Sequence, residues 1–190
     1  MALASNALID ISYVSRMLHS VDVGDDDFAE ELINQASSIA EGLARRQLIA
    51  REVTEVLDGS GRTRLLLREY PVQAVASVHI DADRGFGSDT EVSDYYVESG
   101  PGILHRDAGF GRVAQSVRVV YTGGPFASLD DVDSDLQEAV VELVSWLWTR
   151  QRSNNIAIRA TEGLDGVRTE HELTIPLQAR RTIESYGRLR

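Results

Sequence analysis

The sequence contains no cysteine and no lysine. Without cysteine, the protein has no disulfides, no thiolate metal sites and no cysteine nucleophile. Without lysine, it lacks the phosphate-binding loop of nucleotide hydrolases, whose motif requires one. No apolar run approaches the ~20 residues that a membrane span requires. The opening MALASNALIDISYV also lacks the basic segment and long apolar stretch of a secretory signal. These absences predict a soluble protein of the cytosolic type.

The charge balance of the chain is strongly acidic. Its formal net charge is −11 over 190 residues, and all 19 basic residues are arginine. A protein of this charge is not expected to attract nucleic acid phosphate without a local basic patch. The candidate for such a patch is the C-terminus, which carries Arg180, Arg181, Arg188 and Arg190. The arginine bias itself is most simply explained by a GC-rich genome.

The most strongly patterned stretch is Ser134–Arg152, which the spacing of apolar residues predicts to be the central helix. One apolar stripe repeats at helical intervals, and a second face carries Val141 and Trp148, with Val144 between the two. A helix that is apolar on most of its circumference needs partners on two sides. We expect one side to pack on the protein's own core. The other side packs either on more of that core or on a neighbouring subunit.

The remaining chain shows two kinds of periodicity. Helical spacing predicts an N-terminal pair of helices, the first capped by Asp10, and a short C-terminal helix opened by Pro176. Between them the period falls to two, which predicts strands. The turn residues Asp58–Gly61 and Ser99–Gly102 predict two β-hairpins.

The predicted fold class is therefore α+β, a helical bundle with an inserted antiparallel β region. We expect the 190 residues to form a single domain. Its segments are a helical region (1–50), a β excursion (51–124), the central helix with its lead (125–152), and an arm with the C-terminal helix (153–190).

No residue pattern points to catalysis. The Asp25–Asp27 run lacks the alternating spacing of a calcium loop and is better explained as the acidic first turn of a helix. The glycines of Gly59–Thr63 fall in a predicted hairpin, so phosphate binding is not expected there. The acidic residues are too numerous to single out a catalytic pair. No metal-ligand spacing relates the four histidines His19, His79, His105 and His171. The sequence predicts no enzyme, no cofactor and no metal.

Taken in order, the elements resemble the head–tail connector proteins (adaptor or head-completion proteins) of long-tailed bacteriophages. Such proteins begin with a short helix, an acidic turn and a longer amphipathic helix, followed by a β excursion and a long helix. The segments that carry the resemblance are Asp10–His19, Gly24–Phe28, Glu30–Ala36, Tyr70–Val72, Tyr95–Val97, Val117–Gly124, Trp148–Arg152 and the Ile175–Arg190 tail. The motifs are structural and degenerate, but they span nearly the whole chain.

The resemblance implies a structural virion protein of the head–tail junction, present in the host cytoplasm during assembly. It implies a ring of identical copies, possibly twelve, beneath the portal protein. The next connector or tail protein would bind this ring, and DNA would pass through its channel without specific binding. The alternatives are another connector layer, such as a stopper or tail-completion protein, or an interaction module outside any virion.

Within this connector-like domain, we expect two groups of interface residues. The second face of the central helix is the candidate contact with a neighbouring subunit, through Val141, Val144 and Trp148. The C-terminal helix is the candidate for docking on the portal or a neighbour, through Arg180, Arg181, Ile183, Tyr186 and Arg190. The Gly- and Asp-rich loop Asp81–Asp94 is expected to meet the next layer.

Overall fold

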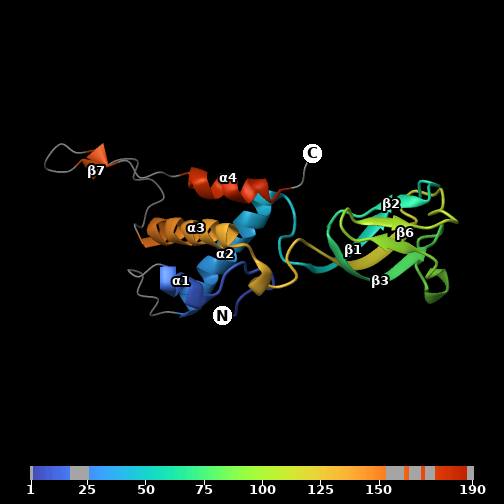
Figure 1. Cartoon of the computed structure of the whole chain (residues 1–190), viewed down its shortest axis with the longest axis horizontal. Coiled ribbons are helices and arrows are strands. Elements are labelled where there is room, and N and C mark those ends of the chain that lie inside the picture. The colour runs from blue at the N-terminus through green and yellow to red at the C-terminus, as the bar shows by residue number, and fades with distance from the viewer. Residues whose placement is uncertain (1, 18–25, 153–160, 163–167, 170–173, 188–190) are drawn as a thin grey trace. The chain divides into compact units, whose positions relative to one another are not determined.

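The computed structural model describes residues 2–17, 26–152, 161–162, 168–169 and 174–187. The contacts within the chain divide it into two compact units. The helical unit contains Met1–Arg46 and Leu129–Arg190, and the β unit contains Gln47–Ser128 (Figure 1). Both limits of the β unit lie within a few residues of the segment boundaries predicted from the change in periodicity.

Helices dominate the described part of the helical unit. α3 packs against both α2 and α4, and α2 also contacts α1 and α4 (Figure 1). The elements of this unit, in chain order, are α1 (Ile11–Met17), α2 (Asp26–Ala44), the 3-10 turn η2 (Leu129–Asp131), α3 (Ser134–Arg152), the short ribbon strands β7 (Thr161–Glu162) and β8 (Arg168–Thr169), and α4 (Leu177–Ser185).

Local capping sets where these helices begin. Asp10 precedes α1, and its Oδ1 accepts hydrogen bonds from the Tyr13 N–H (2.6 Å) and the Ser12 hydroxyl (2.8 Å). α4 begins directly after Pro176, whose missing N–H leaves no helical hydrogen bond unmade.

The bounds of α3 coincide with those predicted from its apolar spacing. Its predicted stripe is buried, with Leu136, Val140 and Leu143 all fully covered.

The β unit consists of two three-stranded antiparallel sheets, ordered β1-β6-β3 and β2-β5-β4. β6 is the central strand of the first sheet, and β5 is the central strand of the second. The elements of this unit are β1 (Arg51–Leu57), β2 (Arg64–Leu66), β3 (Val72–Ile80), the 3-10 turn η1 (Ser88–Thr90), β4 (Tyr96–Glu98), β5 (Ile103–His105) and β6 (Val117–Gly123).

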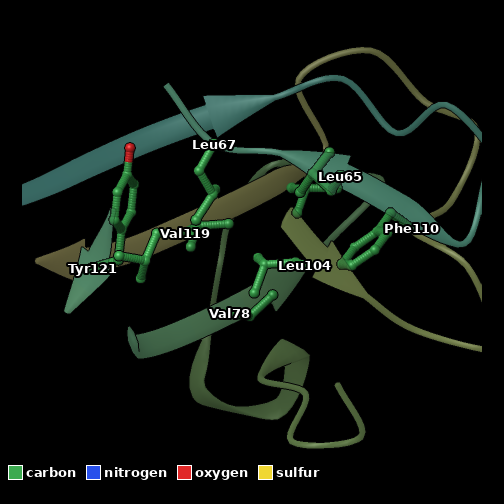
Figure 2. Packing of buried hydrophobic residues seen from close by; sticks show 9 residues of the cluster. Leu65, Leu67, Val78, Leu104, Phe110, Val119 and Tyr121 are labelled. Carbon is green, nitrogen blue, oxygen red and sulfur yellow. The ribbon is translucent and has the colours of Figure 1, made fainter. Parts of the chain in front are cut away.

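A hydrophobic core of its own holds the β unit together. Alternate residues of β6 point inward, as expected for a strand with one buried face. Figure 2 shows Leu65 of β2 beside Phe110, with Tyr121 of β6 at the far end of the same cluster. The buried members are Leu65, Leu67, Val72, Val78, Leu104, Phe110, Val117, Val119 and Tyr121.

One of the two predicted hairpins is correct and the other is wrong. β4 and β5 pair across the turn at Ser99–Gly102, as predicted. β1 and β2, however, do not pair with each other across Asp58–Gly61, because β1 pairs with β6 and β2 pairs with β5. The turn instead carries the chain from one sheet to the other. A local turn signal does not decide which strand a segment pairs with when long-range partners compete.

The predicted fold class is also wrong in its central statement. The protein is not a helical bundle into which a β region is inserted, because the β unit forms two complete sheets around its own buried cluster. The four α-helices found among the described residues occupy the other unit. Sequence periodicity correctly located both kinds of element, but it does not reveal that the strands enclose a separate core. That the 190 residues act as one connector-like domain remains a prediction.

Candidate interaction surfaces

The predicted subunit face of α3 is already largely covered within the helical unit. Val141 and Val144 are 6% and 2% exposed, so they have little surface to offer a neighbour. Trp148 is half-buried and packs on Phe28 of α2, with ring centroids 5.2 Å apart. Of the three residues, Trp148 therefore retains the most surface for a contact with another copy. The interface role of all three remains a prediction.

The predicted docking residues of α4 divide into a buried and an exposed set. Ile183 is fully buried and anchors the helix on the helical unit. Arg180 is exposed and forms an ion pair with Glu184 one turn later (2.8 Å), a geometry that contributes only about 0.3–0.5 kcal/mol at a surface. Arg181 is exposed. Arg190 lies outside the described residues, so the C-terminal basic patch is only partly placed.

Tyr186 ties the end of α4 to the beginning of α3. Its hydroxyl lies 2.6 Å from Oδ1 of Asp135 and 2.9 Å from Oδ2 of Asp133, and it shares its one hydrogen between these two carboxylates. Burial, followed by these two carboxylates, raises the pKa of Tyr186 well above its ordinary value. The phenol therefore keeps its proton, and remains a hydrogen-bond donor, to a higher pH than an ordinary tyrosine would. This predicted docking residue is thus engaged inside its own unit.

A groove runs between α3 and α4. It has a volume of about 180 Å³, and acidic side chains of α3 form one wall while small and polar side chains of α4 form the other. Glu138 and Glu142 make no hydrogen bond or ion pair with any part of the chain that the structure describes. The residues that line the groove are Asp135, Glu138, Ala139, Glu142, Gln178, Ala179 and Thr182. We call this feature the acidic groove.

The predicted contact loop, Asp81–Asp94, is held in one conformation by its first residue. The Asp81 carboxylate accepts hydrogen bonds from the backbone N–H groups of Asp83, Gly85 and Phe86, each at 2.8 Å. These bonds favour the charged form and hold the pKa of Asp81 below its ordinary value. Phe86 has a left-handed backbone (φ 49°), which a non-glycine residue adopts only when its surroundings impose it.

A second set of contacts fixes the same loop from the adjacent strand. The Arg118 guanidinium of β6 donates to the Phe86 carbonyl (3.0 Å) and lies 4.9 Å from the centre of its ring. The sequence did not single out Asp81, because it is one of several aspartates in a Gly-rich stretch. The available signal was its position directly after a strand, with glycine four residues later.

Replacing Asp81 by alanine is expected to loosen this loop. Amide hydrogen exchange at Asp83, Gly85 and Phe86 should accelerate about tenfold, because each amide loses its acceptor. The folded pKa of Asp81 is depressed, so its contribution to stability is present above its ordinary pKa of 3.8 and is lost as the pH falls below that value. Compared as protection factors, which remove the intrinsic pH dependence of exchange, the wild-type loop should therefore loosen in acid, while the Asp81→Ala loop should show no such change. Asp83→Ala is the matched control, and equal acceleration in that variant would contradict the anchoring role of Asp81.

The described histidines serve structural roles. The His79 ring is buried, and its Nδ1 lies 3.2 Å from the Gly87 carbonyl. His105 Nε2 lies 3.2 Å from the Glu98 carboxylate in the neighbouring strand. His19 and His171 lie outside the described residues. Within the described ranges, no cluster of three or more histidine or acidic residues could hold a metal ion. No helix among the described residues is long and apolar enough to cross a membrane.

Comparisons with known proteins identify the family of this chain. The model of the head completion protein family matches residues 7–189. No curated protein matches the sequence. In solved structures, the fold is similar to a chain from the neck of a native gene transfer agent (GTA) particle computed with C12 symmetry. The TM-score is 0.67 and the identity 20%, over 100% of this chain and 93% of that chain.

Two further GTA structures contain a similar chain. One is the virion of the native particle, with a TM-score of 0.67 and 19% identity, covering 100% of this chain and 94% of the other. The second is the neck of the empty particle computed with C6 symmetry, with a TM-score of 0.67 and 18% identity over the same shares. These identities establish a shared fold, and the family model spans nearly the whole sequence. The chain therefore belongs to the head completion protein family, which confirms the resemblance to head–tail connector proteins and the structural, virion-associated role that this resemblance implies.

Proposed function

We propose that the protein is a non-enzymatic building part of the head–tail junction, which assembles as a ring of identical copies on the portal protein. The observation that carries this proposal is the shared fold over 100% of this chain with a chain from a particle neck computed with C12 symmetry. The next connector or tail protein would bind the opposite face of the ring.

The surfaces described above fit a subunit that has neighbours on two sides. Trp148 keeps part of its ring exposed on the face predicted for the adjacent copy, and Arg181 is exposed on α4 for the portal or a neighbour. The net charge of −11 also suits a DNA conduit, because repulsion of phosphate lets the DNA slide rather than bind. A ring of heterologous contacts closes when the rotation between copies divides a full turn.

Mass photometry and electron microscopy of the purified full-length chain, alone and with its portal protein, test this function. A ring of twelve copies would have twelve times the 20.9 kDa mass of the monomer. We expect such a species at least when the portal is present, with the ring stacked on the portal in class averages. A chain that remains monomeric at high concentration, both alone and with the portal, would rule out the ring.

A further inference from the structure

Three arginines of the β unit lie in or directly beside two loops that are bonded to each other. Arg62 lies in the connection from β1 to β2, Arg64 begins β2, and Arg112 lies in the loop from β5 to β6. The Arg112 side chain passes directly over Gly61, because a Cβ on that glycine would lie 2.8 Å from Arg112 Cγ. We call these three residues the basic tip.

The basic tip is rigid because the two loops are joined through their backbones. The Gly59 N–H donates to the Val113 carbonyl (2.9 Å), and the Phe110 N–H donates to the Arg62 carbonyl (3.2 Å). Phe110 itself is fully buried beside Leu65 and so fastens the second loop to the core (Figure 2). The arginines are therefore presented by a fixed scaffold rather than by a loose hairpin.

The charges of the basic tip are unsatisfied within the part of the chain that the structure describes. All three arginines are exposed, and none of their guanidinium groups forms a hydrogen bond or ion pair with the described residues. Two other arginines of the β unit are engaged, Arg106 with Asp94 at 2.8 Å and Arg118 with the Phe86 carbonyl, whereas the exposed Arg68 guanidinium, like those of the tip, has no partner among the described residues. Three unpaired cations held together in a protein of net charge −11 indicate a surface that meets an anionic partner.

The acidic groove has the complementary chemistry. Glu138 and Glu142 lie one turn apart on α3 without a partner among the described residues, and no cation lines the groove. Across the groove, Gln178 and Thr182 of α4 offer further polar groups to a guanidinium. Each copy thus carries an unpaired basic surface on one unit and an unpaired acidic surface on the other.

We propose that the basic tip of one copy docks in the acidic groove of a second copy. Both complementary surfaces belong to the same chain, so every copy can give one contact and receive one, which is the arrangement that closes a ring. The acidic balance of the chain makes a second copy a better occupant than nucleic acid, whose phosphates the rest of the surface repels. The inference rests on the ring proposed above and names the charged contact between its subunits.

Charge exchange between the two surfaces tests this contact in the full-length chain. The tip variant carries Arg62→Glu, Arg64→Glu and Arg112→Glu, and the groove variant carries Glu138→Arg and Glu142→Arg. We expect each variant alone to raise the protein concentration needed for half-maximal ring formation at least about tenfold, since attraction becomes repulsion. The variant with all five substitutions should recover most of the lost assembly. Rising salt should weaken the wild-type ring and affect the separate variants less.

Arg68→Glu is the matched control, because it reverses one exposed arginine of the same unit away from the tip. It should assemble like wild type, whereas Arg64→Glu should not. Circular dichroism checks that the variants are folded. If the wild type forms rings and the tip and groove variants form them equally well, the docking contact is wrong but the ring is correct. If neither the wild type nor any variant forms rings with the portal present, both the proposed ring and the proposed docking contact are wrong. If tip reversal abolishes binding to a short DNA duplex without affecting rings, the tip is a nucleic acid contact and the docking proposal is overturned.

Discussion

The Phe110→Ala variant is expected to lose about 3–5 kcal/mol of the free energy of unfolding of the β unit. Phe110 is fully buried and belongs to the cluster that both sheets of this unit enclose (Figure 2). The substitution removes the apolar contact area of the ring and leaves a cavity that the surrounding strands can fill only in part. Few single changes in the β unit should cost more.

The measurement has to report on the β unit alone. Both tryptophans, Trp146 and Trp148, lie in α3, so tryptophan fluorescence follows the helical unit. Amide exchange at Val119 and Tyr121 in the central strand β6 follows the unfolding of the β unit instead. The matched control is Val113→Ala, an apolar residue of the same loop that is 38% exposed, for which a change within about 0.5 kcal/mol is expected. Equal losses in the two variants would show that Phe110 is not an anchor.

The same substitution connects stability to the proposed docking contact. Phe110 fastens the loop that carries Arg112, and its backbone N–H reaches the Arg62 carbonyl. Without the ring, the loop should lose its fixed position, and the basic tip should lose its preorganisation before the β unit unfolds. Ring assembly should therefore weaken in Phe110→Ala at temperatures where the variant is still folded, but not in Val113→Ala.

The helices were predictable because their signals are local. The apolar spacing that places Leu136, Val140 and Leu143 on one face of α3 repeats every turn and gave both ends of the helix correctly. The cap at Asp10 is likewise a contact between residues three apart in sequence. The same periodicity could not say what covers Val141 and Val144, because α2, which packs on α3, is distant from it in the sequence.

Apart from the β4–β5 hairpin, the pairing of the strands could not be predicted, because it depends on partners that are distant in the sequence. The turn at Asp58–Gly61 has the composition of a hairpin, yet β2 pairs with β5 some forty residues later in the chain. Phe110 and the loop around it pack beside this turn instead. A single phenylalanine between two glycines does not predict this role. The proximity of Arg62 and Arg112 follows from this pairing, so the basic tip was invisible in the sequence, which pointed to the C-terminus instead.

The second large effect expected in the β unit comes from removing one oxygen atom. Tyr121 is fully buried in β6, and its hydroxyl donates to Glu55 Oε1 (2.9 Å) and accepts from the Glu69 N–H (2.9 Å). Burial, the largest cause, raises the pKa of Tyr121 well above its ordinary value, so the phenol keeps its proton and donates throughout the accessible pH range. Tyr121→Phe should lower the free energy of unfolding of the β unit by about 2–4 kcal/mol, because a buried carboxylate oxygen and a buried amide lose this partner together.

Tyr95→Phe is the matched control for Tyr121→Phe, because it removes a tyrosine hydroxyl without removing any hydrogen bond to the described residues. Tyr95 also packs against the core cluster, but its hydroxyl forms no hydrogen bond among the described residues, so its removal should change stability by less than about 0.5 kcal/mol. Unfolding followed by amide exchange in β6 measures both variants. Measuring Tyr121→Phe, Glu55→Ala and the double variant then gives the coupling between the two side chains, which we expect to reach about 1 kcal/mol or more, as for residues of one buried network. Additive losses would mean that the hydrogen bond between Tyr121 and Glu55 does not contribute to the stability of the β unit. These two partners, which are 66 positions apart in the sequence, would then be held together by the packing around them rather than by their hydrogen bond.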